Sequence, residues 1–186
     1  MRLFIAIKIP EDIRSSFASL LKEFRAIAPQ VKWVRAGNLH VTLKFLGETE
    51  STKLGALQNV LSAIRSAEPV NLEFHGLGFF PNENRPRVFW AGMEASANLK
   101  ALAAEIDQAA HRIGFPLEER PFAPHLTMAR FQPPGIPPKF LQAIREKSEQ
   151  VFGSLCTSEI HLIESKLKPT GAEYTTLQSF RFATEA

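Results

Sequence analysis

Two short stretches of the chain each combine an imidazole with a hydroxyl group. The tetrad His-Val-Thr-Leu at 40–43 recurs as His-Leu-Thr-Met at 125–128, so histidine and threonine are both displaced by 85 residues. With five histidines and nine threonines in 186 residues, about 0.2 His-x-Thr triplets are expected by chance. The repetition makes these four side chains the first candidates for chemistry, and it indicates a duplicated lobe that supplies one equivalent strand twice.

The alternation of side chains along a strand predicts how each tetrad is used. His40 and Thr42 project from one face, whereas the apolar residues of the tetrad project from the other face and anchor the strand in a core. The same alternation applies to His125 and Thr127. Two such pairs that face each other across a cleft would form a four-point clamp.

This clamp suits the opening of a cyclic phosphodiester by water. The reaction takes one proton from the nucleophile and gives one to the leaving alkoxide, and imidazole, with a reference pKa of about 6.5, does either near neutral pH. His40 and His125 can therefore hold the two states at once. The hydroxyls of Thr42 and Thr127 can donate to the non-bridging phosphate oxygens. Chemistry of this kind needs no metal ion.

Two basic residues close to the tetrads have alternative interpretations. Arg130 lies five positions beyond His125, so on an unbroken strand it faces away from that side, and only a bulge or the strand end turns it toward a phosphate. On regular alternation Lys44 shares the face of His40 and Thr42. There it either adds charge near the anion or is simply a solvated lysine.

If the cyclic phosphodiester belongs to an RNA end, other basic and aromatic residues are candidates for contact with that RNA. Arg85 and Arg87 lie in a turn rich in proline and asparagine, where they either grip an RNA backbone or serve solubility. Four aromatic residues are candidates for stacking on terminal bases, as aromatic side chains often do beside single-stranded RNA: Trp33, Phe80, Phe122 and Tyr174. We favour Phe122 because it shortly precedes His125.

The remaining histidines and the single cysteine are expected to be structural. His75, His111 and His161 lack the carboxylate spacing of a metal site, so we predict no bound metal. Cys156 has no partner for an internal disulfide and is expected to be a small core residue. Neither GxGxxG nor GxxxxGK occurs, and no cofactor is predicted.

Hydrophobic periodicity divides the chain into strands and helices. Alternation enriched in Val, Ile, Phe and Trp predicts strands near 2–9, 31–35, 39–46, 71–79, 87–93, 125–131, 156–167 and 173–182. Apolar spacings of three and four predict helices over 11–28, 51–66 and 95–113, and a shorter one at about 138–152. The proline-rich segment 132–138 is predicted to be an exposed turn or loop.

These elements favour an α+β class, because strands and helices mix without strict βαβ alternation. A chain of 186 residues fits one compact unit or two tightly fused lobes. No stretch approaches the ~18 apolar residues of a spanning helix, and the N-terminal segment is expected to be a first strand and not a signal peptide. The net charge of +3 suggests a local anion site, and the single cysteine fits a reducing cytoplasm.

The chain resembles the 2H phosphoesterase superfamily, and within it the RNA 2′,3′-cyclic phosphodiesterases of bacteria and archaea, also known as 2′-5′ RNA ligases. The likeness is carried by both tetrads in their wider context, Leu-His-Val-Thr-Leu-Lys-Phe-Leu-Gly at 39–47 and Pro-Phe-Ala-Pro-His-Leu-Thr-Met-Ala-Arg at 121–130. It runs nearly end to end and includes the segments 2–6, 33–34, 80–81, 85–90 and 164–174. One departure is Met128, where leucine is commoner in the family; it lies on the packing face, where the exchange should matter little.

The resemblance implies a single domain over 1–186, made of two pseudo-symmetric, interleaved lobes of mainly antiparallel sheet with outer helices around a central cleft. It also implies hydrolysis of RNA 2′,3′-cyclic phosphate ends to 2′-phosphates, with His40 as proton donor and His125 as proton acceptor. The residues alone leave that assignment open. The same site run in reverse would join RNA ends by a 2′-5′ linkage. We expect a cytoplasmic monomer whose partner is RNA with such ends.

Two rival functions remain at this point. The clamp could hold a nucleotide or RNA end without turnover, although both histidines and both threonines are intact. It could also serve a 2H phosphodiesterase that acts on another small cyclic phosphate.

Overall fold

The computed structural model describes residues 1–132, 135–169 and 171–183. The strands in these residues are β1 (Arg2–Lys8), β2 (Lys32–Trp33), β3 (His40–Glu48), β4 (Val70–Phe80), β5 (Val88–Ala95), β6 (Leu126–Arg130), β7 (Val151–Thr157), β8 (Glu159–Lys168) and β9 (Gly171–Arg181). The α-helices are α1 (Glu11–Ile27), α2 (Leu54–Ser62), α3 (Asn98–Arg112) and α4 (Pro138–Arg145). Short 3-10 turns at Ala36–Asn38 and Ser51–Lys53 precede β3 and α2.

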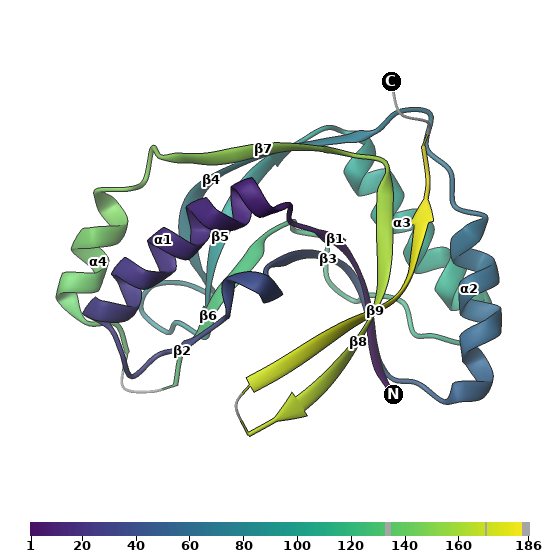
Figure 1. Ribbon diagram of the computed structural model, residues 1–186, viewed down its shortest axis with the longest axis horizontal. Coiled ribbons are helices and arrows are strands. Elements are labelled where there is room, and N and C mark those ends of the chain that lie inside the picture. Colours follow the sequence, from purple (N-terminus) through teal and green to yellow (C-terminus); the bar gives the residue numbers. More distant parts are fainter. Residues whose placement is uncertain (133–134, 170, 184–186) are drawn as a thin grey trace.

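All strands join one strongly curved antiparallel sheet, as Figure 1 shows. Its order is β7-β4-β5-β6-β3-β1-β8-β9, and β2 pairs with β6 off this path. The middle of this order lies between β6 and β3. From there outward, one half contains β6, β5, β4 and β7 in turn, and the other contains β3, β1, β8 and β9 at the equivalent positions. The sheet therefore has two equivalent halves related by a pseudo-twofold axis between β3 and β6, which confirms the predicted pseudo-symmetry.

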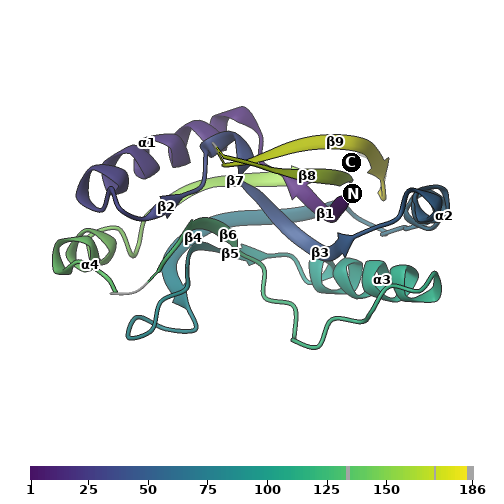
Figure 2. The same ribbon diagram turned by 90° about the horizontal axis from the view of Figure 1, so that it is seen from below.

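The helices connect the two halves crosswise. Helix α1 follows β1 in the chain, yet Phe17 on α1 packs against Phe74 of β4 and Phe152 of β7 in the opposite half, with ring centroids 6.0 and 5.0 Å apart. Helices α1 and α4 lie together at one end of the molecule, and α2 and α3 lie together at the other (Figures 1 and 2). None of the helices in the described part of the chain is long and apolar enough to cross a bilayer.

The side chains of strand β1 point alternately to two faces of the sheet. Leu3, Ile5 and Ile7 belong to the large core cluster under the helices, and each is at most 1% exposed. Phe4 and Ala6 point to the other face, where they form a small apolar cluster with Ile163. The alternating, β-branched sequence of β1 thus builds both layers at once.

Several predicted boundaries are wrong. The helix expected over 138–152 ends at Arg145, and β7 begins at Val151. The strand expected over 156–167 is two strands, β7 and β8, separated at the buried Ser158. The helix expected from 51 begins as a 3-10 turn and ends at Ser62. Cys156, expected in the core, is exposed on β7, which forms an edge of the sheet.

Candidate active site

The two tetrads meet on the central strands β3 and β6. Val41 pairs directly with Leu126 in an antiparallel ladder. A regular antiparallel ladder continued by one step to either side of this pair would place His40 opposite Thr127 and Thr42 opposite His125. The structure therefore brings the two tetrads together on neighbouring strands at the centre of the sheet.

Both imidazoles are held in the same way by their own backbone. Nδ1 of His40 lies 2.7 Å from the carbonyl oxygen of Asn38, and Nδ1 of His125 lies 2.8 Å from that of Ala123. A carbonyl can only accept, so Nδ1 of each ring is the protonated nitrogen that donates. Nε2 of each neutral ring is then left with its lone pair, ready to accept a proton.

Each histidine also lies against aromatic rings. His40 contacts Phe4 and Tyr174, with ring centroids 4.7 and 5.3 Å apart. His125 lies edge-on to Phe80 at 5.0 Å. These contacts fix the ring planes. Phe80 and Tyr174 were among the candidates for stacking on RNA bases, and in this structure both rings pack against a histidine.

The electrostatic environment of His40 favours its neutral form. Burial lowers the pKa of His40 below the ordinary 6.5, the hydrogen bond to the Asn38 carbonyl raises it, and positive charge on His125 lowers it further. Burial also raises the pKa of Tyr174, while the nearby Arg130 and Arg2 lower it.

Each tetrad has a bulge at its last residue. Thr42 lies opposite Ala6 and Lys44 opposite Ile5, so the residue between them, Leu43, has no partner on β1. In the other half Thr127 lies opposite Trp90 and Ala129 opposite Phe89, so Met128 is the unpaired residue. An unpaired residue shifts the alternation by one position and turns every later side chain to the opposite face.

The bulges determine which way the side chains of Lys44 and Arg130 point. Lys44 was expected beside His40 and Thr42, but the bulge turns it into the core, where its side chain is 1% exposed. Arg130 is turned by the equivalent bulge to the face of His125 and Thr127, and it is exposed there. The equivalent of Arg130 in the other half is Phe45, so the clamp is symmetric at its centre and differs at its two ends.

Lys44 joins three segments around the site. Its Nζ lies 2.5 Å from Oδ1 of Asp107 on α3 and donates to the carbonyl oxygen of Pro116 at 2.9 Å. Oε1 of Glu118 lies 3.8 Å away, and the Glu118 backbone N–H donates to Asp107. The network ties β3 to α3 and to the segment that leads into His125. The sequence carries no local signal for Asp107, because its contact with Lys44 spans 63 residues.

A groove of about 900 Å³ opens beside Thr42 and His125. Phe122 and Arg87, both predicted to contact RNA, line it, and so do Phe45 and Phe80. Arg85 is exposed in the turn before β5 and does not line the groove. Trp33 lies elsewhere: its ring packs on Phe89 and Phe140 in the core, and its Nε1 donates to the carbonyl of Ala28.

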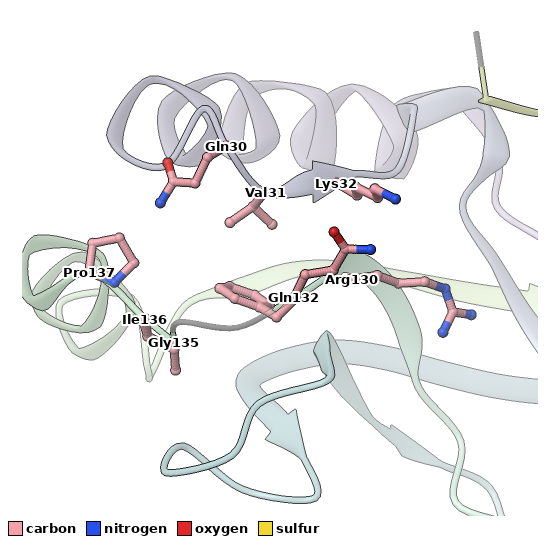
Figure 3. A pocket seen from close by; sticks show the side chains of 9 residues that line it. Gln30, Val31, Lys32, Arg130, Gln132, Gly135, Ile136 and Pro137 are labelled. Carbon is pink, nitrogen blue, oxygen red and sulfur yellow. The ribbon is translucent and has the colours of Figure 1, made fainter. Parts of the chain in front are cut away.

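A second hollow, of about 480 Å³, lies at the C-terminal end of β6. It is bounded by Gln30, Val31 and Lys32 on one side and by residues that follow β6 on the other (Figure 3). The side chains of Lys32 and Arg130 extend in the same direction, away from Pro137 (Figure 3). Lys32 is the direct cross-strand partner of Arg130, so two exposed cations lie side by side here.

The remaining histidines lie outside the clamp. His111 is bonded through Nδ1 to the carbonyl of Phe115, and His161 to the hydroxyl of Ser179. His75 lies beside the carboxylates of Glu73 and Glu94, so three potential metal ligands lie within 4.8 Å of one another. This group lies on β4 and β5 and includes no tetrad residue.

Comparison with known proteins identifies the family. The family model described as LigT like Phosphoesterase matches residues 7–90 and 92–174, one segment for each half of the chain. A Methanothermobacter thermautotrophicus protein named RNA 2′,3′-cyclic phosphodiesterase is 34% identical over 182 residues, covering 97% of this chain and 98% of its own. The Archaeoglobus fulgidus protein of the same name is 34% identical over 180 residues, covering 97% and 99% of the two chains.

Solved structures agree with the sequence comparison. The crystal structure of the Thermus thermophilus protein TT0787 superposes with a TM-score of 0.80 at 30% identity and covers 98% of each chain. That of Escherichia coli LigT in complex with 3′-AMP gives a TM-score of 0.76 at 31% identity and covers 97% of each chain. The symmetric clamp, the curved sheet and these matches together show that the chain belongs to the LigT-like 2H phosphoesterase family.

Proposed function

We propose that this protein hydrolyses RNA ends carrying a 2′,3′-cyclic phosphate to 2′-phosphomonoesters, using His40 and His125 as acid and base. One observation carries the proposal: the Val41–Leu126 pair sets the two His-x-Thr motifs opposite each other with both Nδ1 atoms occupied by backbone carbonyls. The activity named for the relatives from M. thermautotrophicus and A. fulgidus supports it.

In the proposed reaction a water molecule attacks the phosphorus in line with the P–O3′ bond. Nε2 of His125 accepts the proton of the water while the P–O3′ bond breaks. Nε2 of His40, protonated at the start, donates its proton to O3′. The phosphate remains on O2′, and His40 ends neutral while His125 ends protonated. Proton exchange with solvent then restores the starting state.

The donor role requires that His40 carries a proton when the substrate is bound. In the free enzyme burial and the charge on His125 lower the pKa of His40 and disfavour that proton. An anionic phosphodiester between the rings opposes both effects, because a nearby negative charge stabilises imidazolium. Substrate binding itself therefore prepares the acid.

The hydroxyls and one guanidinium complete the proposed phosphate site. Thr42 and Thr127 donate to the two non-bridging oxygens, whose charge grows as the pentacovalent state forms. Arg130 adds positive charge from the end of β6, on the face to which its bulge has turned it. With both proton transfers assigned to imidazoles, we propose a metal-independent reaction.

Turnover of a short RNA ending in a 2′,3′-cyclic phosphate tests this function. We expect a small amount of the protein to convert all of this RNA to a phosphomonoester. RNA that already ends in a monophosphate should be left unchanged. Saturable binding of the cyclic end without conversion would support the rival function of a nucleotide-binding module. The reverse reaction, a 2′-5′ joining to a 5′-hydroxyl end, should appear only at high RNA concentration, since water competes for the same position.

A further inference from the structure

We propose that Trp90 is a positioning residue for the acid–base reaction: it is seated on two glycines of the sheet and holds the ring of Phe80 against His125. This inference rests on the proposed function and deepens it, because it names what orients the imidazole that serves as the base. Trp90 acts through Phe80, and in the described part of the chain its own ring makes no contact with the imidazole.

Strand pairing places Trp90 on the face of the sheet that carries the clamp. Its cross-strand partners are Thr127 on β6 and Gly78 on β4. Its neighbours along β5, Phe89 and Ala91, are both 0% exposed in the main core. Side chains alternate along a strand, so Trp90 projects from the opposite face, beside Thr127.

The indole ring occupies space that two glycines leave free. A Cβ atom on Gly78 would lie 2.6 Å from Cη2 and 2.9 Å from Cε2 of Trp90, closer than non-bonded carbon atoms approach. A Cβ atom on Gly92 would lie 3.1 Å from Cζ3 of the same ring. The ring therefore lies directly against the backbone of β4 and β5, and Gly78 has no room for a side chain while the ring stays in place.

From this seat the indole supports the aromatic ring that orients His125. The ring centroids of Trp90 and Phe80 lie 5.2 Å apart, and those of Phe80 and His125 lie 5.0 Å apart with nearly perpendicular planes. Phe80 is half-buried at the end of β4, where a side chain has fewer packing neighbours than in the middle of a strand. Contact with the indole therefore restrains Phe80, and Phe80 in turn restrains the imidazole.

The two histidines of the clamp differ in this support. Among the described residues His40 contacts two aromatic rings, Phe4 and Tyr174. His125 contacts one, that of Phe80. Displacing Phe80 should therefore disturb one imidazole and leave the other as an internal control.

The indole is specific to one half of the sheet and acts through its shape. Trp90 lies opposite Thr127, whereas the equivalent position opposite Thr42 is occupied by Ala6. Nε1 of Trp90 is buried, and within the described ranges no hydrogen-bond partner is found for it. An unpaired buried N–H group destabilises a fold. The position thus uses the size and flatness of the ring and not its hydrogen bond.

Nitrogen chemical shifts of the two imidazoles test the positioning directly. At a pH where both rings are neutral, wild-type His40 and His125 should both show the tautomer with the proton on Nδ1, because each Nδ1 donates to a backbone carbonyl. Gly78→Ala places a methyl group against the indole and displaces it. The His125 signals should then become those of a mixture of tautomers, and the His40 signals should keep their wild-type values.

Hydrolysis of an RNA with a cyclic phosphate end provides the second readout. Trp90→Leu and Gly78→Ala should each lower kcat at least about tenfold, since a displacement of about 1 Å at the reacting groups costs up to about a hundredfold in rate. KM should stay within about twofold, because the substrate keeps its ground-state contacts. The double variant should be no slower than Trp90→Leu alone, because the methyl group then meets no indole.

Gly55→Ala is the matched control, because nothing lies within 4 Å of a Cβ atom at this exposed position of α2. It should equal the wild type in both readouts. Trp90→Phe keeps an aromatic ring at the position and should recover part of the activity that Trp90→Leu loses. If circular dichroism shows that the larger changes prevent folding, Trp90→Phe replaces them, and a smaller change confined to the His125 signals is expected.

Three results would overturn the inference: additive losses of kcat in the double variant, equal changes in the signals of both histidines, or wild-type kcat in folded Trp90→Leu. If the wild type hydrolyses no cyclic phosphate, it is the proposed function that fails. The nitrogen shifts, which need no turnover, still decide in that case whether Trp90 positions His125.

Discussion

At the scale of single residues, each histidine of the clamp is fixed by a backbone carbonyl on one side and by an aromatic ring on the other. His40 and His125 make these contacts in equivalent ways, although the aromatic partners come from different elements, Phe4 from β1 and Phe80 from β4. The tetrads themselves are visible in the sequence. The rings that orient them are not, because Phe80 lies 45 residues before His125 and periodicity gives no information about contacts between strands.

Removing either imidazole should abolish most of the activity. His40→Ala and His125→Ala are each expected to lower kcat by at least about a hundredfold, the contribution of one lost acid or base. Steady-state hydrolysis of an RNA with a cyclic phosphate end measures the effect. His111→Ala serves as the control, because this exposed histidine lies outside the clamp. Near wild-type turnover in either clamp variant would exclude the two-histidine mechanism.

The pH dependence of kcat/KM should be bell-shaped, with one limb below pH 6.5. Burial and the charge on His125 lower the pKa of His40 below its ordinary value of 6.5, and kcat/KM reports the ionisation of the free enzyme. An NMR titration should show the pKa of His40 rising in His125→Gln, which removes a repulsive charge. If both apparent pKa values of the profile lie at or above 6.5, the pKa of His40 is not lowered in the free enzyme.

The same shift makes a prediction for stability. Because the pKa of His40 is lower in the folded chain, the unfolded chain binds more protons as the pH falls below about 6.5. The contribution of His40 to the free energy of unfolding is therefore complete above that pH and declines as the pH falls through the folded pKa. Urea unfolding of His40→Gln should lose this part of the pH dependence. An unchanged profile would assign acid destabilisation to other groups.

At the scale of elements, the paired bulges decide which side chains reach the site. Simple alternation places Lys44 beside His40 and turns Arg130 away, and the structure shows the opposite in both cases. The bulge depends on how each strand pairs with its neighbour, so it leaves no mark in the composition of the tetrad. The repeat indicates an equivalent strand, and equivalent strands carry equivalent bulges.

Errors of element length have a similar origin. The residues 156–167 alternate like one strand, but the chain bends at Ser158. Before the bend β7 pairs with β4, and after it β8 pairs with β1, in the other half of the sheet. Local periodicity cannot distinguish one long strand from two consecutive strands with different partners.

Loss of the buried ammonium group of Lys44 should destabilise the fold strongly. Lys44→Met leaves Asp107 and the Pro116 carbonyl without their partner, and breaking a buried ion pair from one side costs about 3–5 kcal/mol. Urea unfolding measures the change. Lys44→Met combined with Asp107→Leu removes both charges and should recover part of the loss. Exposed ion pairs contribute only about 0–1 kcal/mol. If the free energy of unfolding of Lys44→Met lies within about 1 kcal/mol of the wild-type value, the pair is not buried in solution.

At the scale of the whole molecule, the two halves form one structure because their helices cross over. Helix α1 covers strands of the opposite half, and β3 and β6 join the halves into a single sheet. The sequence predicted two lobes from the repeat and the resemblance, and strand order confirms their symmetry. Phe45 and Arg130 occupy equivalent positions at the two ends of the clamp. One is apolar and the other is cationic, so the two ends differ although the halves are symmetric.

This interleaving predicts a single cooperative unfolding transition. Trp33 and Trp90 both lie in the half that contains β6, since β2 and β5 pair with that strand. Tryptophan fluorescence therefore reports on one half, whereas far-UV circular dichroism reports on both. The two urea transitions should coincide. Separate midpoints would show that each half folds independently.

We propose that the two-histidine clamp opens a 2′,3′-cyclic phosphate at the P–O3′ bond without a metal ion. The most direct measurement incubates a short RNA with that end and the purified protein in EDTA, and then separates 2′-phosphate from 3′-phosphate products. We predict turnover that EDTA does not affect and a 2′-phosphate product. A 3′-phosphate product would exclude cleavage at the P–O3′ bond, and activity that is lost on chelation and restored by a divalent metal ion would exclude a metal-free mechanism.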